Sequence, residues 1–212
     1  MEQKTVLIWD WDNTLVDTYE VIYRSLNDLS AHYGKPAVTP EETLSIIGNS
    51  GRKYLFQRFG LDMEEASAFY WNCYLKNARY VQPIKGAQAL LQWVQKQGFI
   101  NTVDSNKRGD VLKKECHDLG WDSYFTAMVG SEDTPFEKPS KEMAMSILKK
   151  LTYDRLIVIG DGLSDMQLAQ NLKATAVFVR DVPPVSTEFK SVRIDFDCKD
   201  LNQVKEVLAH LR

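Results

Sequence analysis

Two aspartates, Asp10 and Asp12, stand two residues apart in the stretch IWDWDNTLVDT, directly after a short apolar run. Two carboxylates this close repel each other, so their joint ionisation needs a compensating positive charge nearby. A lone Asp-x-Asp at the end of a strand usually forms a turn or caps a helix. Its meaning therefore depends on which other side chains the fold brings to the same place.

Three further polar groups follow other apolar runs or stand in a loop between them: Ser105 with Asn106, then Lys138, then Asp161 with Asp165 in GDGLSD. Each alone has an ordinary explanation as a helix cap, a solvated lysine or a common loop. If the strands are parallel, however, their carboxyl ends meet at one edge, where ligands bind. The acids would form a cluster there that is unfavourable unless a hard cation neutralises it. Mg²⁺ is the natural candidate because it prefers oxygen ligands.

Strands and helices that could position these groups alternate along the second half of the chain. Short β-branched and apolar runs predict strands at residues 5–9, 99–103, 126–129, 156–159 and 175–179, with 193–198 a candidate edge strand. Helical periodicity, often closed by glycine, predicts helices at residues 86–97, 108–119, 140–151, 164–172 and 201–211. This alternation predicts an α/β fold, a Rossmann-like, doubly wound parallel sheet covered on both faces.

The segment after the first strand has helical signals only. Thr39 and Glu42 form a capping box with proline between them, and Asp62 caps a longer aromatic helix that ends near Tyr80. Another short helix is expected at about residues 50–59. We therefore expect an all-helical insertion in an α/β core, with the core formed by residues 1–16 and 83–212 and the insertion by residues 17–82.

Composition excludes several classes of protein. The 212 residues carry a formal net charge of -3 and no long basic run, which argues against a nucleic-acid partner. No apolar stretch approaches the roughly 18 residues of a membrane helix, so no membrane partner is expected. The three cysteines are widely spaced and fit no zinc pattern. Reduced thiols in a cytoplasmic protein are the simplest interpretation.

Taken in order, the motifs DWDNT, SN, KP and GDGLSD resemble the four signature motifs of the haloacid dehalogenase superfamily. The helical insertion is similar to the C1-type cap of that superfamily, and the layout most resembles its phosphoglycolate phosphatase-like branch. The resemblance spans nearly the whole chain. One residue departs from the pattern, because Asp104 precedes Ser105 where family members usually carry an apolar residue.

The resemblance implies a role for each residue of the motifs. Asp10 would be the nucleophile that attacks phosphorus and becomes an aspartyl-phosphate. Asp12 would be the general acid that protonates the leaving alcohol and then the base that activates water. Thr14 and Ser105 would hold the transferring phosphoryl group, and Asn106 would orient the same region. An acid at position 12 favours phosphoester chemistry, because the dehalogenases and phosphonatase-like members lack one there.

Neutralisation of charge would come from a lysine and a metal ion. Lys138 would place its positive charge beside Asp10 and the phosphoryl oxygens. By the same resemblance, Mg²⁺ would be bound by the Asp10 carboxylate, the Asp12 backbone carbonyl and Asp161. Asp165 would belong to the metal site either directly or through water.

The insertion would select the substrate. Its turn IGNSGR carries Asn49 and Arg52, at a place where caps of this kind often face the active site. Arg52 could bind a substrate carboxylate or second phosphate through two hydrogen bonds, or it could be an ordinary solvated arginine.

The leading interpretation is a Mg²⁺-dependent phosphatase that hydrolyses a small-metabolite phosphomonoester, such as phosphoglycolate, a sugar phosphate or a nucleotide. Its partner would be that small phosphorylated metabolite, and the protein would be a monomer or a small homo-oligomer. One alternative is a phosphomutase of the β-phosphoglucomutase type, which would use the same site but return the phosphoryl group to the sugar. The other is a non-catalytic binding or regulatory protein that keeps the fold.

Overall fold

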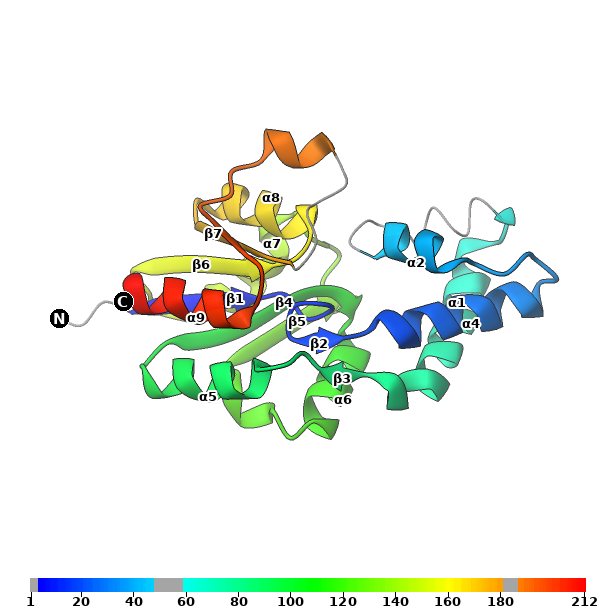
Figure 1. The fold of residues 1–212 in the computed structure, drawn as a ribbon, viewed down its shortest axis with the longest axis horizontal. Helices are drawn as coiled ribbons and strands as arrows, with labels where there is room; N and C mark the ends of the chain where they lie inside the picture. Colours follow the sequence, from blue (N-terminus) through cyan, green and yellow to red (C-terminus); the bar gives the residue numbers. More distant parts are fainter. Residues whose placement is uncertain (1–3, 48–58, 181–186) are drawn as a thin grey trace. The chain divides into compact units, whose positions relative to one another are not determined.

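The computed structural model describes residues 4–47, 59–180 and 187–212, whose helices and strands are shown in Figure 1. The strands are β1 (Thr5–Trp9), β2 (Val16–Asp17), β3 (Gln82–Pro83), β4 (Ile100–Arg108), β5 (Ala127–Ser131), β6 (Arg155–Gly160), β7 (Thr175–Val179) and β8 (Phe196–Cys198). The α-helices are α1 (Tyr19–His32), α2 (Pro40–Ile46), α4 (Met63–Asn77), α5 (Ala87–Lys96), α6 (Gly109–Asp118), α7 (Lys141–Leu148), α8 (Leu163–Leu172) and α9 (Leu201–His210). Short 3₁₀ turns are η1 (Ala78–Tyr80), η2 (Asp122–Tyr124) and η3 (Thr187–Ser191).

Six of the described strands form one sheet in the order β5-β4-β1-β6-β7-β8. Every neighbouring pair in this sheet is parallel. The α/β fold predicted from alternating strands and helices is therefore confirmed, including the candidate edge strand, which appears as the shorter β8. β1 lies in the middle of the sheet between β4 and β6, so Asp10, the residue after it, emerges at the centre of the carboxyl edge.

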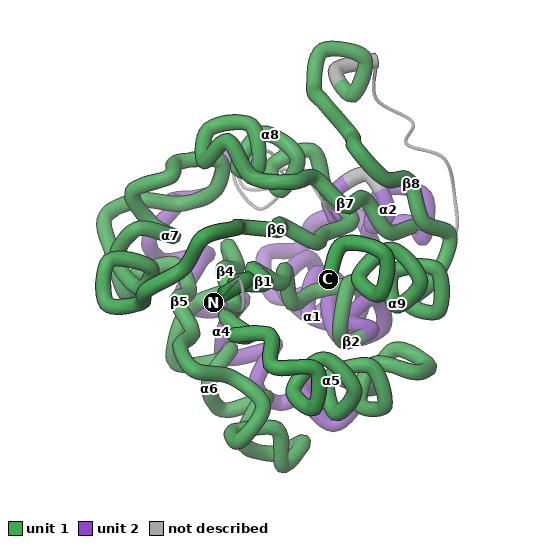
Figure 2. The backbone as a smooth tube through the Cα atoms, turned by 90° about the vertical axis from the view of Figure 1, so that its left-hand side faces the viewer, with its two compact units in different colours: residues 1–16, 83–212 green, residues 17–82 purple. Residues whose placement is uncertain are grey.

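Helices cover both faces of the sheet, as Figure 2 shows, with α7 and α8 on one face and α5, α6 and α9 on the other. The core on the first face combines apolar residues of the sheet with those of the two helices. Its fully buried members include Ile8 and Val158 from the strands and Leu148, Met166 and Ala169 from the helices. This packing fixes the strand ends from which the candidate functional side chains project.

β4 is longer than its sequence indicates. The predicted strand stops at Val103, but β4 runs on to Arg108, with an irregularity in its pairing with β5 between Ser105 and Arg108. Such bulges allow a strand to redirect side chains near functional sites. Ser105 and Asn106 thus lie within the strand rather than in the turn that follows it, which corrects the sequence-based placement.

The chain divides into two compact units, residues 1–16 with 83–212 and residues 17–82, drawn in two colours in Figure 2. The second unit contains α1, α2 and α4. The Thr39 hydroxyl accepts a hydrogen bond from the Glu42 amide at 3.2 Å, and the Glu42 carboxylate accepts one from the Thr39 amide at 3.1 Å, so the capping box is confirmed. Asp62 caps α4 as predicted, through the amides of Glu64 and Glu65.

The expected helix at about residues 50–59 lies almost entirely outside the described residues. No helix in the described part of the chain is both long and apolar enough to cross a membrane.

Candidate active site

A tight turn after β1 shapes the first motif. Asn13 has a φ of 58°, in the left-handed region that asparagine tolerates better than most residues. Its amide donates to the Val16 carbonyl at 2.6 Å, and the Trp11 carbonyl accepts from the amides of Leu15 and Val16 at 3.0 and 3.1 Å. This network fixes the backbone on which Asp12 and the neighbouring motif residues are carried.

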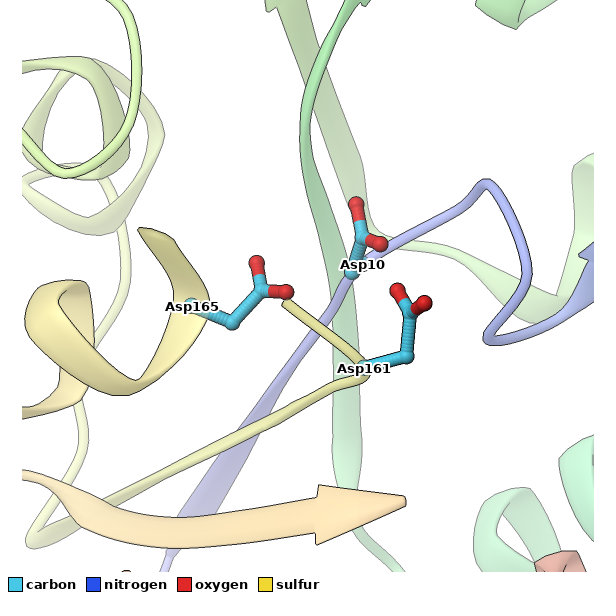
Figure 3. Close-up of side chains that lie close together, drawn as sticks. All are labelled: Asp10, Asp161 and Asp165. Atoms are coloured by element: carbon cyan, nitrogen blue, oxygen red, sulfur yellow. The ribbon is translucent and has the colours of Figure 1, made fainter. Parts of the chain in front are cut away.

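Asp10, Asp161 and Asp165 come together beside this turn, as Figure 3 shows. One carboxylate oxygen from each lies within 4.8 Å of the others, and all three residues are buried. Asp161 directly follows β6, and Asp165 belongs to the first turn of α8. Buried carboxylates at this spacing repel one another strongly, so the arrangement requires positive charge nearby.

Lys138 supplies part of that charge from the loop before α7. Its Nζ donates to Asp10 Oδ1 at 2.6 Å and to Asp165 Oδ1 at 2.7 Å, and all three side chains are buried. The other oxygen of Asp165 accepts a hydrogen bond from the Gly162 amide at 3.0 Å. A Cβ atom on Gly160 would stand only 2.3 Å from the Asp165 carboxyl carbon, so this packing requires glycine there.

The electrostatics of the cluster follow from burial. Burial raises the pKa of Asp10 to about 7, against the opposing charge of Lys138, and burial likewise raises the pKa of Asp161. Burial alone would lower the pKa of Lys138, but the charges of Asp10, Asp165 and Asp104 outweigh it and raise that pKa. Lys138 is thus held as a cation. Its single positive charge cannot balance all three carboxyl groups of the cluster if each of them is ionised.

The donor set fits a divalent metal ion. Three buried carboxylates supply only oxygen ligands, which are those that hard cations such as Mg²⁺ prefer. Burial raises the pKa values of Asp10 and Asp161, and a bound cation would lower them again.

Thr14 and Ser105 both contribute hydroxyl groups near the carboxyl edge of the sheet, Thr14 from the turn after β1 and Ser105 from within β4. The Thr14 hydroxyl is buried 3.4 Å from Asp10 Oδ2 and 3.5 Å from Asp161 Oδ1. The Ser105 hydroxyl, also buried, accepts a hydrogen bond from the Lys107 amide at 3.2 Å. Both hydroxyls can donate to an anion, which is the chemistry expected of a phosphoryl-binding group.

Asn106 connects β4 to the loop that carries Lys138. Its side-chain oxygen accepts from the Lys138 amide at 2.7 Å, and its side-chain nitrogen donates to the Lys138 carbonyl at 3.2 Å. Its amide group fixes the backbone from which the Lys138 ammonium reaches Asp10.

The Asp12 carboxylate is directed to a second cation. Asp12 Oδ1 lies 2.6 Å from Nζ of Lys107, a residue whose side chain is 2% exposed. Lys107 also donates to both carboxylate oxygens of Glu115, at 3.0 and 2.8 Å. Burial alone would lower the pKa of Lys107, but Asp12 and Glu115 together raise it.

Sequence reasoning assigned no role to Lys107 or Glu115. The only signal was that Lys107 directly follows Ser105 and Asn106. The Asp12 carboxylate is not one of the three carboxylates that come together beside the turn.

Asp104 is an additional acid, close enough to interact electrostatically with Lys138, Asp165 and Asp10. It is 1% exposed, and no described residue forms a hydrogen bond with either of its carboxylate oxygens. Burial raises its pKa to about 7, with Lys138 acting in the opposite direction and Asp165 and Asp10 adding to the rise. Asn49 and Arg52, the two expected substrate-binding residues, lie outside the described residues.

Comparison with known proteins adds sequence and structural relatives. A family model described as "Haloacid dehalogenase-like hydrolase" matches residues 7–179. A phosphoglycolate phosphatase from Agrobacterium fabrum is 27% identical over 204 residues, covering 89% of this chain and 88% of that protein. The pyrophosphatase PpaX from Listeria monocytogenes is 27% identical over 176 residues, covering 79% of each chain. A haloacid dehalogenase-like family hydrolase of solved structure, from Streptococcus pneumoniae, shares the fold with a TM-score of 0.84 at 19% identity, over 99% of both chains.

Proposed function

Because this chain belongs to the haloacid dehalogenase-like hydrolase family, whose model matches residues 7–179, we propose that it is a Mg²⁺-dependent phosphatase of small phosphomonoesters. The observation that carries the proposal is the contact of 2.6 Å between Lys138 Nζ and Asp10 Oδ1 within a cluster of three buried carboxylates. An attacking carboxylate, a fixed cation and a set of oxygen ligands are the parts that phosphoryl transfer requires.

In the proposed reaction, Asp10 supplies the attacking oxygen. As the new bond from Asp10 to phosphorus forms, the bond from phosphorus to the ester oxygen breaks and its electron pair goes to that oxygen. Asp12 donates a proton to the same oxygen, so the alcohol leaves neutral and an aspartyl-phosphate remains on Asp10. Water then attacks phosphorus, Asp12 takes one proton from it, and inorganic phosphate leaves as the Asp10 carboxylate is restored.

The cations and hydroxyls of the site hold the phosphoryl group during transfer. Lys138 remains charged beside Asp10 and can bind a phosphoryl oxygen with an N–H that Asp10 and Asp165 do not use. The Thr14 and Ser105 hydroxyls would donate to the other phosphoryl oxygens. Asp165 has one oxygen on Lys138 and the other on the Gly162 amide, so we assign it chiefly to orienting the lysine.

The Asp10 and Asp161 carboxylates and the Asp12 backbone carbonyl would hold the Mg²⁺ ion. When bound, Mg²⁺ supplies Lewis-acid neutralisation of the negative charge on the transferring phosphoryl group. Asp161 follows β6 directly, so the sheet itself fixes its distance from Asp10.

A small substrate with a second anionic group is the class that the relatives favour, because phosphoglycolate carries a carboxylate and pyrophosphate a second phosphate. Residues 17–82 would form the cap that selects this substrate, with Asn49 and Arg52 as its contacts. The three cysteines are free thiols in the structure, which supports a cytoplasmic location. We propose a monomer or small homo-oligomer.

The test is phosphate release from a panel containing phosphoglycolate, pyrophosphate, sugar phosphates and nucleotides, with Mg²⁺ or with a chelator. We expect metal-dependent release, and we expect the Asp10→Asn variant to lose it by about three orders of magnitude or more, because its amide cannot attack phosphorus. Asp110→Asn, which removes an exposed aspartate outside the site, is the matched control and should retain full activity.

Each other outcome has a distinct meaning. Conversion of a sugar phosphate to its isomer, with little release of phosphate, would favour the phosphomutase. No turnover of any ester by folded protein would favour a binding or regulatory role. An Asp10→Asn variant with unchanged turnover would contradict the assignment of the nucleophile.

A further inference from the structure

Lys107 links two acids that belong to different elements. Asp12 stands in the turn after β1 and Glu115 on α6, while Lys107 comes from the irregular end of β4. The ammonium group contacts Asp12 Oδ1 at 2.6 Å and the two oxygens of Glu115 at 3.0 and 2.8 Å. The side chains of Lys107 and Glu115 are only 2% and 5% exposed, so these contacts are shielded from solvent.

Glu115 is itself fixed from a second direction. Its Oε2 accepts a hydrogen bond from Trp11 Nε1 at 2.7 Å, and Trp11 is fully buried. The Trp11 ring packs edge-on against Trp121, with ring centroids 5.8 Å apart. Glu115 therefore helps to hold Lys107 in place, and the charge of the lysine is balanced by Asp12 and Glu115 together.

The two oxygens of Asp12 have different surroundings. Oδ1 is buried against Lys107, whereas the Asp12 side chain as a whole is 26% exposed. The exposed part therefore belongs to other atoms of the side chain. Because the contact with Lys107 fixes Oδ1, it also fixes the direction in which Oδ2 of the same carboxyl group points.

We infer that Lys107, supported by Glu115, is a positioning residue that holds the Asp12 carboxyl in the orientation needed to protonate the leaving group. This inference rests on the proposed phosphatase function and adds to it a residue pair outside the four motif roles. Glu115 matters because it accepts from Lys107 with both carboxylate oxygens and from Trp11 Nε1, so it fixes the position of the ammonium that contacts Asp12.

The dependence of the rate on the leaving group separates positioning from a merely structural role. A general acid is needed when the leaving oxygen is basic and hardly needed when it is a stable anion. The substrates are therefore phenyl phosphate and 2,4-dinitrophenyl phosphate, with phosphoglycolate and acetyl phosphate as a second pair. The measured quantity is kcat/KM, which covers all steps through the departure of the leaving group if aspartyl-phosphate formation is irreversible.

The test variant is Lys107→Met/Glu115→Gln, because removing the lysine alone would leave Glu115 buried without a counter-charge. The double variant keeps the net charge, and glutamine can still accept from Trp11. We expect kcat/KM to fall by about tenfold to a hundredfold for phenyl phosphate and phosphoglycolate, but by less than about threefold for the two good leaving groups. Asp12→Asn should show the same pattern with a larger loss.

Two controls make the result specific. Lys114→Met removes an exposed lysine that pairs with Asp118 on the same helix. This variant should leave kcat/KM unchanged for substrates with good and with poor leaving groups. In an Asp12→Asn background, Lys107→Met/Glu115→Gln should add almost no further loss, because a residue that acts through Asp12 has nothing left to position.

If kcat/KM of Lys107→Met/Glu115→Gln falls equally for substrates with good and poor leaving groups, or does not fall at all, the inference is overturned while the phosphatase assignment stays intact. Additive losses with Asp12→Asn would overturn it as well. If the wild-type protein cleaves none of the four substrates and no other ester, the proposed function fails, and this inference fails with it.

Discussion

At the residue scale, Asp104 links the site to the stability of the fold. Its pKa rises from the ordinary value of 3.8 to about 7 in the folded protein, because the side chain is buried. Below about pH 4 both the folded and unfolded chains hold the proton. Between pH 4 and 7 the unfolded chain ionises while the folded chain does not, so this group lowers the free energy of unfolding as pH rises.

We therefore expect Asp104→Asn to gain stability relative to the wild type as pH rises from 4 to 7, by an amount on the order of 4 kcal/mol at most. The measurement is urea unfolding at several pH values, in the presence of a chelator. Asp118→Asn removes an exposed carboxyl and should follow the wild-type pH dependence. Parallel curves for Asp104→Asn and the wild type would show that Asp104 ionises normally in the folded protein.

At the scale of elements, the sequence predicted most strands and helices because apolar periodicity was strong in each. It missed the end of β4, because Asp104 to Lys107 are four polar residues in a row and resemble a turn. It also missed the pair of Lys107 with Glu115, since nothing in a linear pattern shows that a strand end and a helix will meet. The motif residues themselves were found because parallel strands bring their carboxyl ends together, and the resemblance they carried is confirmed at the level of the family.

The β4 extension yields a prediction for Asn106, which fixes the Lys138 backbone through two hydrogen bonds. Asn106→Ala should lower kcat by about tenfold, because loss of these bonds, of about 1 kcal/mol or more, lets the Lys138 ammonium move from Asp10. Asn171→Ala is the matched control, since Asn171 donates to the Pro139 carbonyl of the same loop. Steady-state kinetics that show similar losses in both variants would argue that the loop as a whole, rather than Lys138, is affected.

At the scale of the whole molecule, the proposed metal site would couple Mg²⁺ binding to folding. Mg²⁺ that binds only the folded chain should raise the midpoint of thermal unfolding, by about 5 °C or more at a concentration 100 times the dissociation constant. Asp161→Asn should abolish this shift, and Asp118→Asn should retain it. The readout is differential scanning calorimetry with Mg²⁺ or chelator and requires no substrate. An equal shift in Asp161→Asn would place the metal elsewhere.

The two chain crossings between the compact units are adjacent. β2 pairs with β3, and beside them the Ile84 amide donates to the Leu15 carbonyl at 3.0 Å. Residues 17–82 thus leave and rejoin the α/β unit at neighbouring points, which a short turn could bridge. The helical segment is therefore one continuous stretch of sequence that could be exchanged as a unit. If residues 17–82 select the substrate as we propose, exchanging them in one recombination step would give the same Asp10 and Lys138 a new choice of substrates, with no change to the sheet that holds them.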